Sequence, residues 1–300
     1  MRIDFGPAQG KITLDRISEI LGWSPRRMRI GGPDWPDILK EPQGPDNDWS
    51  MVLPFCETLK NAFEFGCQAQ SIGLREGKGR CWTFICDTAG KDLDELVDVR
   101  EWIAVVGRYV AIRDGLCMSF ALDFDREHGD PNAEHTPIGL LRIRAKPYGR
   151  AADEDALLAA GQLAGALKSF LDSMRSYRFA KCVAAVPPSR SDKPFDLPRH
   201  LAAVLAAECD LEDVSGSVQT VSPRKELKDL PLDEKLPALL DTIEVDPAPI
   251  EGRSVLLIDD LYQSGTTANL VAMELLDAGA KRVLGLFCEK TCRNDANVRV

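Results

Sequence analysis

The chain has 300 residues, a formal net charge of −10 and 44% hydrophobic residues. This length is sufficient for one large domain or two moderate domains with proper cores. No apolar run approaches the length of about 18 residues that a membrane-spanning helix needs, so the sequence predicts a globular protein with no membrane association. The acidic balance argues against broad, non-specific binding of nucleic acids.

The cysteines and the N-terminal residues both bear on the cellular compartment. Nine cysteines are an odd count without a repeating spacing, which is typical of reduced thiols in a cytosol. Cys288 and Cys292 are the closest pair, but without a second pair they are weak evidence for zinc. The first residues lack the apolar core of a signal peptide. We therefore expect a cytoplasmic protein.

The chain opens with a helical pattern over residues 13–22. A Ser-Pro pair at 24–25 is typical of a helix start and would place Arg26, Arg27 and Arg29 in the first turns of a second helix. The two expected helices form either a helix-turn-helix whose arginines meet phosphates or a structural helical hairpin. Any binding of nucleic acid would depend on these arginines.

The rest of the first half predicts an α+β accessory domain. Residues 33–50, rich in proline and aspartate, indicate an irregular connection, and a helical pattern covers about 53–74. Strand-like runs follow at 80–86, 102–106, 117–124 and 138–143. The pattern changes near residue 136, so we place a domain boundary there, with an accessory or regulatory region over 1–133 and a second domain over 134–300.

Helices and strands alternate in the second half, which predicts a parallel sheet between helices. Helices are expected at 153–174 and 195–207, and strands at 181–186, 216–221 and 282–288. The segment 222–231 is polar, basic and bounded by prolines, so we expect it to be mobile.

The most informative stretch is residues 255–267. Four apolar residues predict a buried strand that ends in Asp259 and Asp260. A small loop, Gln263-Ser264-Gly265-Thr266-Thr267, then leads into a helix that stops near Gly279. A helix N-terminus with free N–H groups binds anions, and two acids at a strand end accept hydrogen bonds from vicinal hydroxyls. The stretch therefore predicts a site for a ribose 5-phosphate; the alternative is an ordinary strand whose acids cap the helix.

This stretch resembles the signature of the type I phosphoribosyltransferases, which bind phosphoribosyl pyrophosphate. The resemblance implies an α/β fold with a parallel sheet flanked by helices, and a glycosyltransferase that displaces pyrophosphate by a base or amine. Asp259 and Asp260 would hold the ribose hydroxyls, and residues 263–267 would hold the 5-phosphate. Mg²⁺ would neutralise the pyrophosphate, possible direct ligands being Asp259 and Asp260.

Two further segments take their expected roles from the same resemblance. Pro188, Ser189 and Arg190 follow the first core strand, where the family binds pyrophosphate, and Arg190 would assist the leaving group. Arg224, Lys225 and Lys228 lie where the family has a flexible loop that closes over the site. For each segment the alternative is a plain solvated loop.

The second domain opens like the competence-protein ComF branch of that family, with Lys-Pro-Tyr-Gly-Arg at 146–150 before a long helix. The cysteine-rich module of that branch is missing. Three functions stay open: a transferase, a sensor of phosphoribosyl pyrophosphate linked to DNA handling, and a phosphoribosyltransferase-like toxin of a bacterial anti-phage module paired with a DNA-processing-protein-A-like antitoxin. In the members of that family that use 6-oxopurines, the corresponding loop carries an acid where this chain has Gln263. We also expect a homodimer.

Overall fold

The computed structural model describes residues 8–31, 38–41, 49–53, 55, 57–67, 71–76, 82–86, 96–147, 150–190, 193–222 and 230–292, with the backbone alone for 71–76 and 82–86. The helices are α1 (Leu14–Leu21), α2 (Leu59–Gly66), α3 (Val97–Val106), α4 (Pro137–Ala145), α5 (Glu154–Ser173), α6 (Leu197–Glu208), α7 (Leu232–Lys235) and α8 (Thr266–Asp277). No helix in this described part of the chain is both long and apolar enough to cross a membrane.

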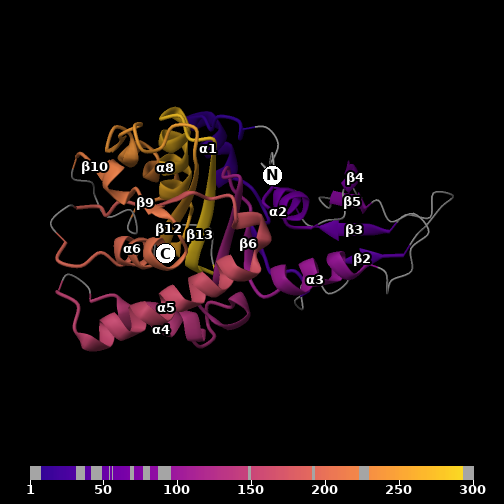
Figure 1. Cartoon of the computed structure of the whole chain (residues 1–300), viewed down its shortest axis with the longest axis horizontal. Helices are drawn as coiled ribbons and strands as arrows, with labels where there is room; N and C mark the ends of the chain where they lie inside the picture. Colours follow the sequence, from indigo (N-terminus) through magenta and orange to yellow (C-terminus); the bar gives the residue numbers. More distant parts are fainter. Residues whose placement is uncertain are drawn as a thin grey trace.

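A seven-stranded sheet in the order β1-β6-β7-β13-β12-β8-β9 forms the centre of the molecule (Figure 1). Its strands are β1 (Arg27–Met28), β6 (Val110–Ile112), β7 (Met118–Phe124), β8 (Cys182–Ala185), β9 (Glu212–Asp213), β12 (Ser254–Tyr262) and β13 (Arg282–Lys290). The five strands from β7 to β9 are parallel, and β6 and β1 continue the sheet antiparallel at one edge. The predicted α/β class, with a mostly parallel sheet between helices, is confirmed.

Side chains alternate along β12 between two apolar layers, because successive residues of a strand point to opposite faces. Val255 and Leu257 pack with residues of α1 and α8 on one face. Leu256 and Ile258 pack with residues of α5 and α6 on the other face. Figure 1 shows these helices on opposite sides of the sheet. Both faces of β12 are therefore buried, which explains its continuous apolar sequence.

Helices α1, α4, α5 and α6 begin where the sequence supplies a side-chain oxygen for a free N–H group. Thr13 accepts from the N–H of Arg16 at the start of α1. Asp153 accepts from the N–H of Ala156 at the start of α5, at 2.9 Å. The predicted helices at 13–22, 153–174 and 195–207 are confirmed as α1, α5 and α6.

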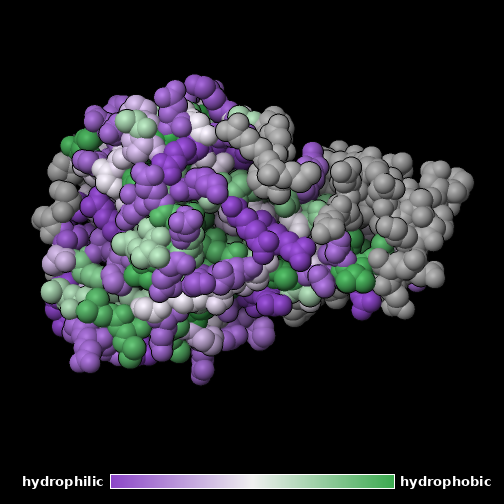
Figure 2. Space-filling model, viewed as in Figure 1, coloured by the Kyte–Doolittle hydropathy of each residue, from purple (hydrophilic) through white to green (hydrophobic). Residues whose placement is uncertain are grey.

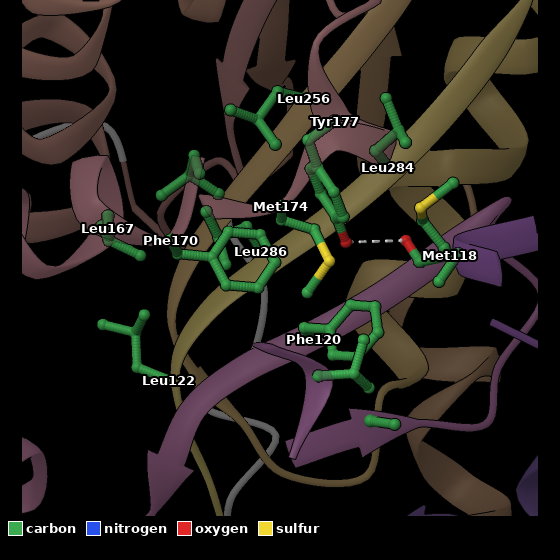
Figure 3. Close-up of a cluster of buried hydrophobic side chains, with 14 of the residues drawn as sticks. Met118, Phe120, Leu122, Leu167, Phe170, Met174, Tyr177, Leu256, Leu284 and Leu286 are labelled. Atoms are coloured by element: carbon green, nitrogen blue, oxygen red, sulfur yellow. Dashed lines mark hydrogen bonds between the residues drawn. The ribbon is translucent and has the colours of Figure 1, made fainter. Parts of the chain in front are cut away.

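Residues from both halves of the sequence share one core. Figure 3 shows Met118, Phe120 and Leu122 of β7 with the second-half side chains Leu167, Phe170, Met174, Tyr177, Leu256, Leu284 and Leu286. The hydroxyl of Tyr177 donates to the carbonyl of Met118 at 3.3 Å. Since β1, β6 and β7 belong to the central sheet, the strands do not divide at the boundary expected near residue 134. The division of roles between the two halves stays a prediction.

The accessory sheet of the first half is built mostly from other strands than the sequence predicts. β2 (Leu39–Lys40), β3 (Ser50–Leu53), β5 (Trp82–Cys86) and β4 (Ser71–Glu76) form an antiparallel four-stranded sheet, extending to the right in Figure 1. The helix expected over 53–74 is only α2, because its last part is strand β4. The runs at 102–106 and 138–143 lie in helices α3 and α4, so both strand predictions are wrong.

The second N-terminal helix is absent from its predicted place. Residues 26–29 are not helical, and β1 within them pairs with β6 at the edge of the central sheet. Arg26 is buried, with 1% of its surface exposed, instead of facing a nucleic acid. Both the helix-turn-helix and the helical-hairpin predictions are therefore wrong. The reason is tertiary, since pairing with β6 satisfies backbone groups that a short, proline-led helix would leave open.

A small two-stranded sheet lies apart from the central sheet. The strand predicted at 216–221 is β10 (Val218–Thr220), which pairs with β11 (Ile243–Val245) in a separate two-stranded sheet.

Most of the surface in Figure 2 is hydrophilic, with hydrophobic areas on the side of α4 and α5. Leu140, Leu157 and Leu158 are exposed on these two helices. The homodimer stays a prediction.

Candidate functional site

The predicted phosphate loop lies at the carboxyl end of β12, in the middle of the parallel sheet. Residues 263–265 join β12 directly to α8, which begins at Thr266. Gly265 has φ +78°, a conformation that side chains with a Cβ rarely adopt. A Cβ at Gly265 would lie 2.1 Å from the hydroxyl oxygen of Tyr262, so only glycine fits. The loop thus forms a tight turn that ends at the N-terminus of α8, where the helix dipole favours an anion.

The loop brings two hydroxyls and several N–H groups together. The Oγ atom of Ser264 and the Oγ1 atom of Thr266 are 2.9 Å apart. Both side chains are buried, while Gln263 and Thr267 are half-buried at the edges of the loop. Among the described residues, the N–H groups of Ser264 and Gly265 have no hydrogen-bond acceptor. Unpaired donors at this point can bind phosphate oxygens.

Asp259 and Asp260 follow the apolar part of β12, as predicted, but their environments differ. Asp260 is buried, and its N–H donates to the Oδ1 atom of Asp259 at 2.8 Å. Burial and the charge of Asp260 raise the pKa of Asp259 well above its usual range. Burial opposes ionisation of Asp260 as well, but Lys146 and Arg142 lower the pKa of Asp260 overall. The surroundings therefore favour the protonated form of Asp259 and the charged form of Asp260.

Helix α4 supplies cations that the sequence did not reveal as part of this site. The Nζ atom of Lys146, just beyond α4, lies 2.7 Å from the Oδ2 atom of Asp260. An Nη1 atom of Arg142 lies 3.7 Å from the same oxygen, and its Nε atom lies 2.5 Å from Glu289. Burial raises the pKa of Glu289 to about 7. Arg142 and Lys146 are separated by one helical turn, a signal that becomes meaningful only when α4 is recognised as a helix.

Two further cations lie beneath the phosphate loop. The Nη2 atom of Arg26 donates to the carbonyl of Ser264 at 2.6 Å. The Nζ atom of Lys290, at the end of β13, donates to the carbonyl of Gln263 at 3.1 Å. Arg26 and Lys290 each have 1% of their surface exposed. Burial and the nearby Arg27 and Arg26 lower the pKa of Lys290 well below its usual range.

The expected pyrophosphate segment lies at the same edge of the sheet. β8 pairs in parallel with β12, Ala185 opposite Ile258, so Pro188, Ser189 and Arg190 follow at the carboxyl end. Pro188 is buried, its carbonyl accepts from the hydroxyl of Thr220 at 2.6 Å, and Arg190 is exposed. The predicted roles of these three residues stay predictions. Arg224, Lys225 and Lys228 lie outside the described residues.

Metal ligation by protein side chains alone finds no support in the described segments, which contain no group of three or more His, Cys, Asp or Glu residues placed to hold an ion. Cys292 instead lies beside Asp125, with its Sγ atom 2.9 Å from the Oδ1 atom. Cys288 is buried in the core on the α5 face of the sheet. Any metal at the strand ends would need further oxygen ligands from a bound molecule.

No protein-family model and no curated protein matches the chain. Among solved structures, the chain is similar to the glutamine phosphoribosylpyrophosphate amidotransferase from B. subtilis complexed with ADP and GMP, with 15% sequence identity and a TM-score of 0.34. The similarity covers 80% of this chain and 48% of the other, so the chain spans about half the length of that protein. A likeness at this level does not assign the chain to a family.

Proposed function

We propose that the chain binds phosphoribosyl pyrophosphate and transfers its phosphoribosyl group to a base or amine, with loss of pyrophosphate. The observation that carries this proposal is the juxtaposition at the end of β12. The loop after β12 has N–H groups without an acceptor among the described residues. It follows closely after two acids of the same strand, which can accept hydrogen bonds from a diol. A ribose 5-phosphate presents a phosphate and a diol at its two ends, which matches this pair of subsites.

The acids are suited to hold a ribose. The recorded contacts of the Asp260 carboxylate with Lys146 and Arg142 use the Oδ2 atom, which leaves Oδ1 to accept from a hydroxyl. The half-buried Asp259 provides a second acceptor beside it. Hydrogen bonds from two vicinal hydroxyls to this pair would fix the sugar at the end of β12.

Charge at the departing pyrophosphate would come from the strand ends. In the proposed reaction the bond from C1 to the pyrophosphate oxygen breaks, and the sugar passes through an oxocarbenium-like state. The acceptor nitrogen bonds to C1 and loses its proton to water. Arg190, which follows β8 at the same edge of the sheet, would meet the negative charge of the leaving group, as would Lys146 if it leaves Asp260. No described residue stands out as a general base.

The acids also fit a pyrophosphate-bound Mg²⁺. Such an ion takes most of its oxygen ligands from phosphates and water, with one or two carboxylates from the protein. Asp259 fits this role because it is half-buried and its pKa is raised, so a cation beside it would favour its charged form. When bound, Mg²⁺ would neutralise charge on the pyrophosphate.

The test measures pyrophosphate release from phosphoribosyl pyrophosphate and Mg²⁺, with pooled cell metabolites as acceptors. We expect release by the wild type and at least a hundredfold loss in Asp259→Asn/Asp260→Asn, roughly the value of lost transition-state contacts. Asp172→Asn is the matched control, because Asp172 is exposed on α5 and pairs only with Lys168 among the described residues. Equal rates in the double variant and this control would overturn the proposal.

Binding without transfer is a second candidate. Lys146 and Arg142 already contact Asp260, so the ligand-free site holds its own counter-charges. A sensor gains from such a closed resting site, whereas a transferase must open it at each turnover. Calorimetry that shows binding of phosphoribosyl pyrophosphate, in a protein that releases no pyrophosphate with any metabolite pool, would favour the sensor. The toxin role and the antitoxin partner stay predictions from the sequence.

A further inference from the structure

We propose that Arg26, from the N-terminal region, is a positioning residue of the phosphate subsite, and that with Lys290 it holds the loop so that its N–H groups face a phosphate monoester. The inference rests on the proposed function, because it concerns the phosphate end of the same ligand. It assigns to residues before the expected catalytic half a direct part in the site.

The first step of the argument is the direction of the loop carbonyls. The carbonyl of Gln263 accepts from Lys290 and that of Ser264 from Arg26, at 3.1 and 2.6 Å. The carbonyl of Gly265 accepts from both the N–H and the side-chain amide of Asn269, at 2.9 and 2.8 Å. Three consecutive carbonyls thus have donors from within the protein. In a planar trans peptide the C=O and the following N–H point in opposite directions.

The second step follows from that geometry. If the carbonyls of residues 263–265 point toward buried donors, the N–H groups of the residues that follow them point away from those donors. Of these, the N–H of Thr266 makes a long contact of 3.4 Å with the hydroxyl oxygen of Ser264. The N–H groups of Ser264 and Gly265 have no acceptor in the part of the chain that the structure describes. A ligand oxygen is the partner that this arrangement lacks.

The third step concerns the unused hydrogen-bonding capacity of Arg26. Its Nε and Nη1 atoms are buried without a hydrogen-bond partner among the described residues. Asp114 lies close enough for its charge to interact with that of Arg26, is 2% exposed, and has one oxygen, Oδ2, also without a partner there. A buried guanidinium with open donors is costly unless another charge compensates it. Asp114 supplies part of that compensating charge, and an anion on the loop would add to it.

The charges around Lys290 also favour a bound anion. Arg26 and Arg27 repel its ammonium group, while Asp125 attracts it. A phosphate dianion bound to the loop would offset the repulsion among these cations. We therefore expect the subsite to prefer a dianionic phosphate monoester.

The experiment is calorimetry with two separate probes, ribose 5-phosphate and pyrophosphate, on the full chain. Arg26→Met removes the charge and the donors, and Arg26→Lys keeps the charge. Arg282→Met is the matched control, since Arg282 is equally buried but lies at the opposite end of β13, against Phe65 and Phe179. We expect Arg26→Met to weaken ribose 5-phosphate at least tenfold and to change pyrophosphate less than twofold. Arg26→Lys should fall between it and the wild type, and Arg282→Met should retain both affinities.

The outcomes separate the two proposals. If the wild type binds neither ribose 5-phosphate nor phosphoribosyl pyrophosphate, the proposed function fails and takes this inference with it. If the wild type binds both and Arg26→Met binds ribose 5-phosphate equally well, the inference alone fails. Equal losses for both probes would show a merely structural role and also overturn it. If circular dichroism shows that Arg26→Met does not fold, Arg26→Lys decides the question. This variant keeps the charge but lacks the guanidinium donors, so an unchanged affinity for ribose 5-phosphate would contradict the positioning role.

Discussion

Replacing Gly265 by alanine tests whether the phosphate loop depends on a residue without a side chain. Two costs can be worked out from the structure. A non-glycine residue at φ +78° is strained by about 1–2 kcal/mol. The new Cβ would also lie 2.1 Å from the hydroxyl oxygen and 2.4 Å from the Cζ atom of Tyr262.

Tyr262 cannot move aside freely. It is 2% exposed, and its ring packs edge-on against Phe287 at a centroid distance of 4.7 Å. Overpacking of this kind costs about 1–3 kcal/mol. The sum, about 2–5 kcal/mol, is a large part of the stability of an ordinary domain, which is about 5–15 kcal/mol. We therefore expect Gly265→Ala to be strongly destabilised.

Gly252 provides the matched control. Its φ is +72°, and a Cβ there would meet nothing within 4 Å, so Gly252→Ala has the backbone strain without the clash. Urea unfolding followed by circular dichroism should show Gly265→Ala less stable than Gly252→Ala by about 1–3 kcal/mol. Equal losses in the two variants would refute the reasoning. Removing the hydroxyl with Tyr262→Phe should recover only part of the loss, because the ring carbon remains in the way.

Three further predictions concern charge, folding and acceptor choice. Burial raises the pKa of Glu289 from 4.5 to about 7, so the stability contributed by its protonated form is complete below pH 4.5 and is lost as pH rises through 7. Relative to the wild type, Glu289→Gln should gain at most about 3 kcal/mol in unfolding free energy between acidic and mildly alkaline urea titrations, and parallel pH profiles would contradict this. Residues 134–300 alone lack β1, β6 and β7, so the fragment should show no cooperative unfolding transition in circular dichroism; a sharp transition would prove it autonomous. Because an amide at Gln263 cannot exchange a proton, hypoxanthine and guanine should be poor acceptors, and efficient nucleotide formation from either, seen by chromatography, would refute this.

The parts of the fold that local sequence determines were predictable. β12, the loop and α8 follow from an apolar run, a glycine and a helix pattern that lie next to each other in the chain. α5 follows from the capping Asp153 and from apolar residues that recur at helical spacing over a long segment. The acids at the strand end could be placed for the same reason, since the end of a buried strand is a local property.

The errors arise where short segments depend on distant partners. Residues 102–106 and 138–143 are apolar runs too short to separate a strand from a helix by periodicity. The roles of Arg26 and Lys146 rest on contacts with residues far away in the sequence, Ser264 and Asp260. No spacing rule connects such pairs, so sequence reasoning found the acids and the loop but missed the cations around them.

The place of β13 between β7 and β12 has a consequence for how the protein is made. β7 ends at Phe124, yet its parallel neighbour begins only at Arg282, so the ribosome releases the two strands far apart in time. Until β13 inserts, β7 and β12 each present an open edge that can pair with another chain. Long-range parallel pairing is also slow. Chains stalled or cut before residue 282 should therefore aggregate, and newly made full-length chains should be clients of chaperones that shield strand edges.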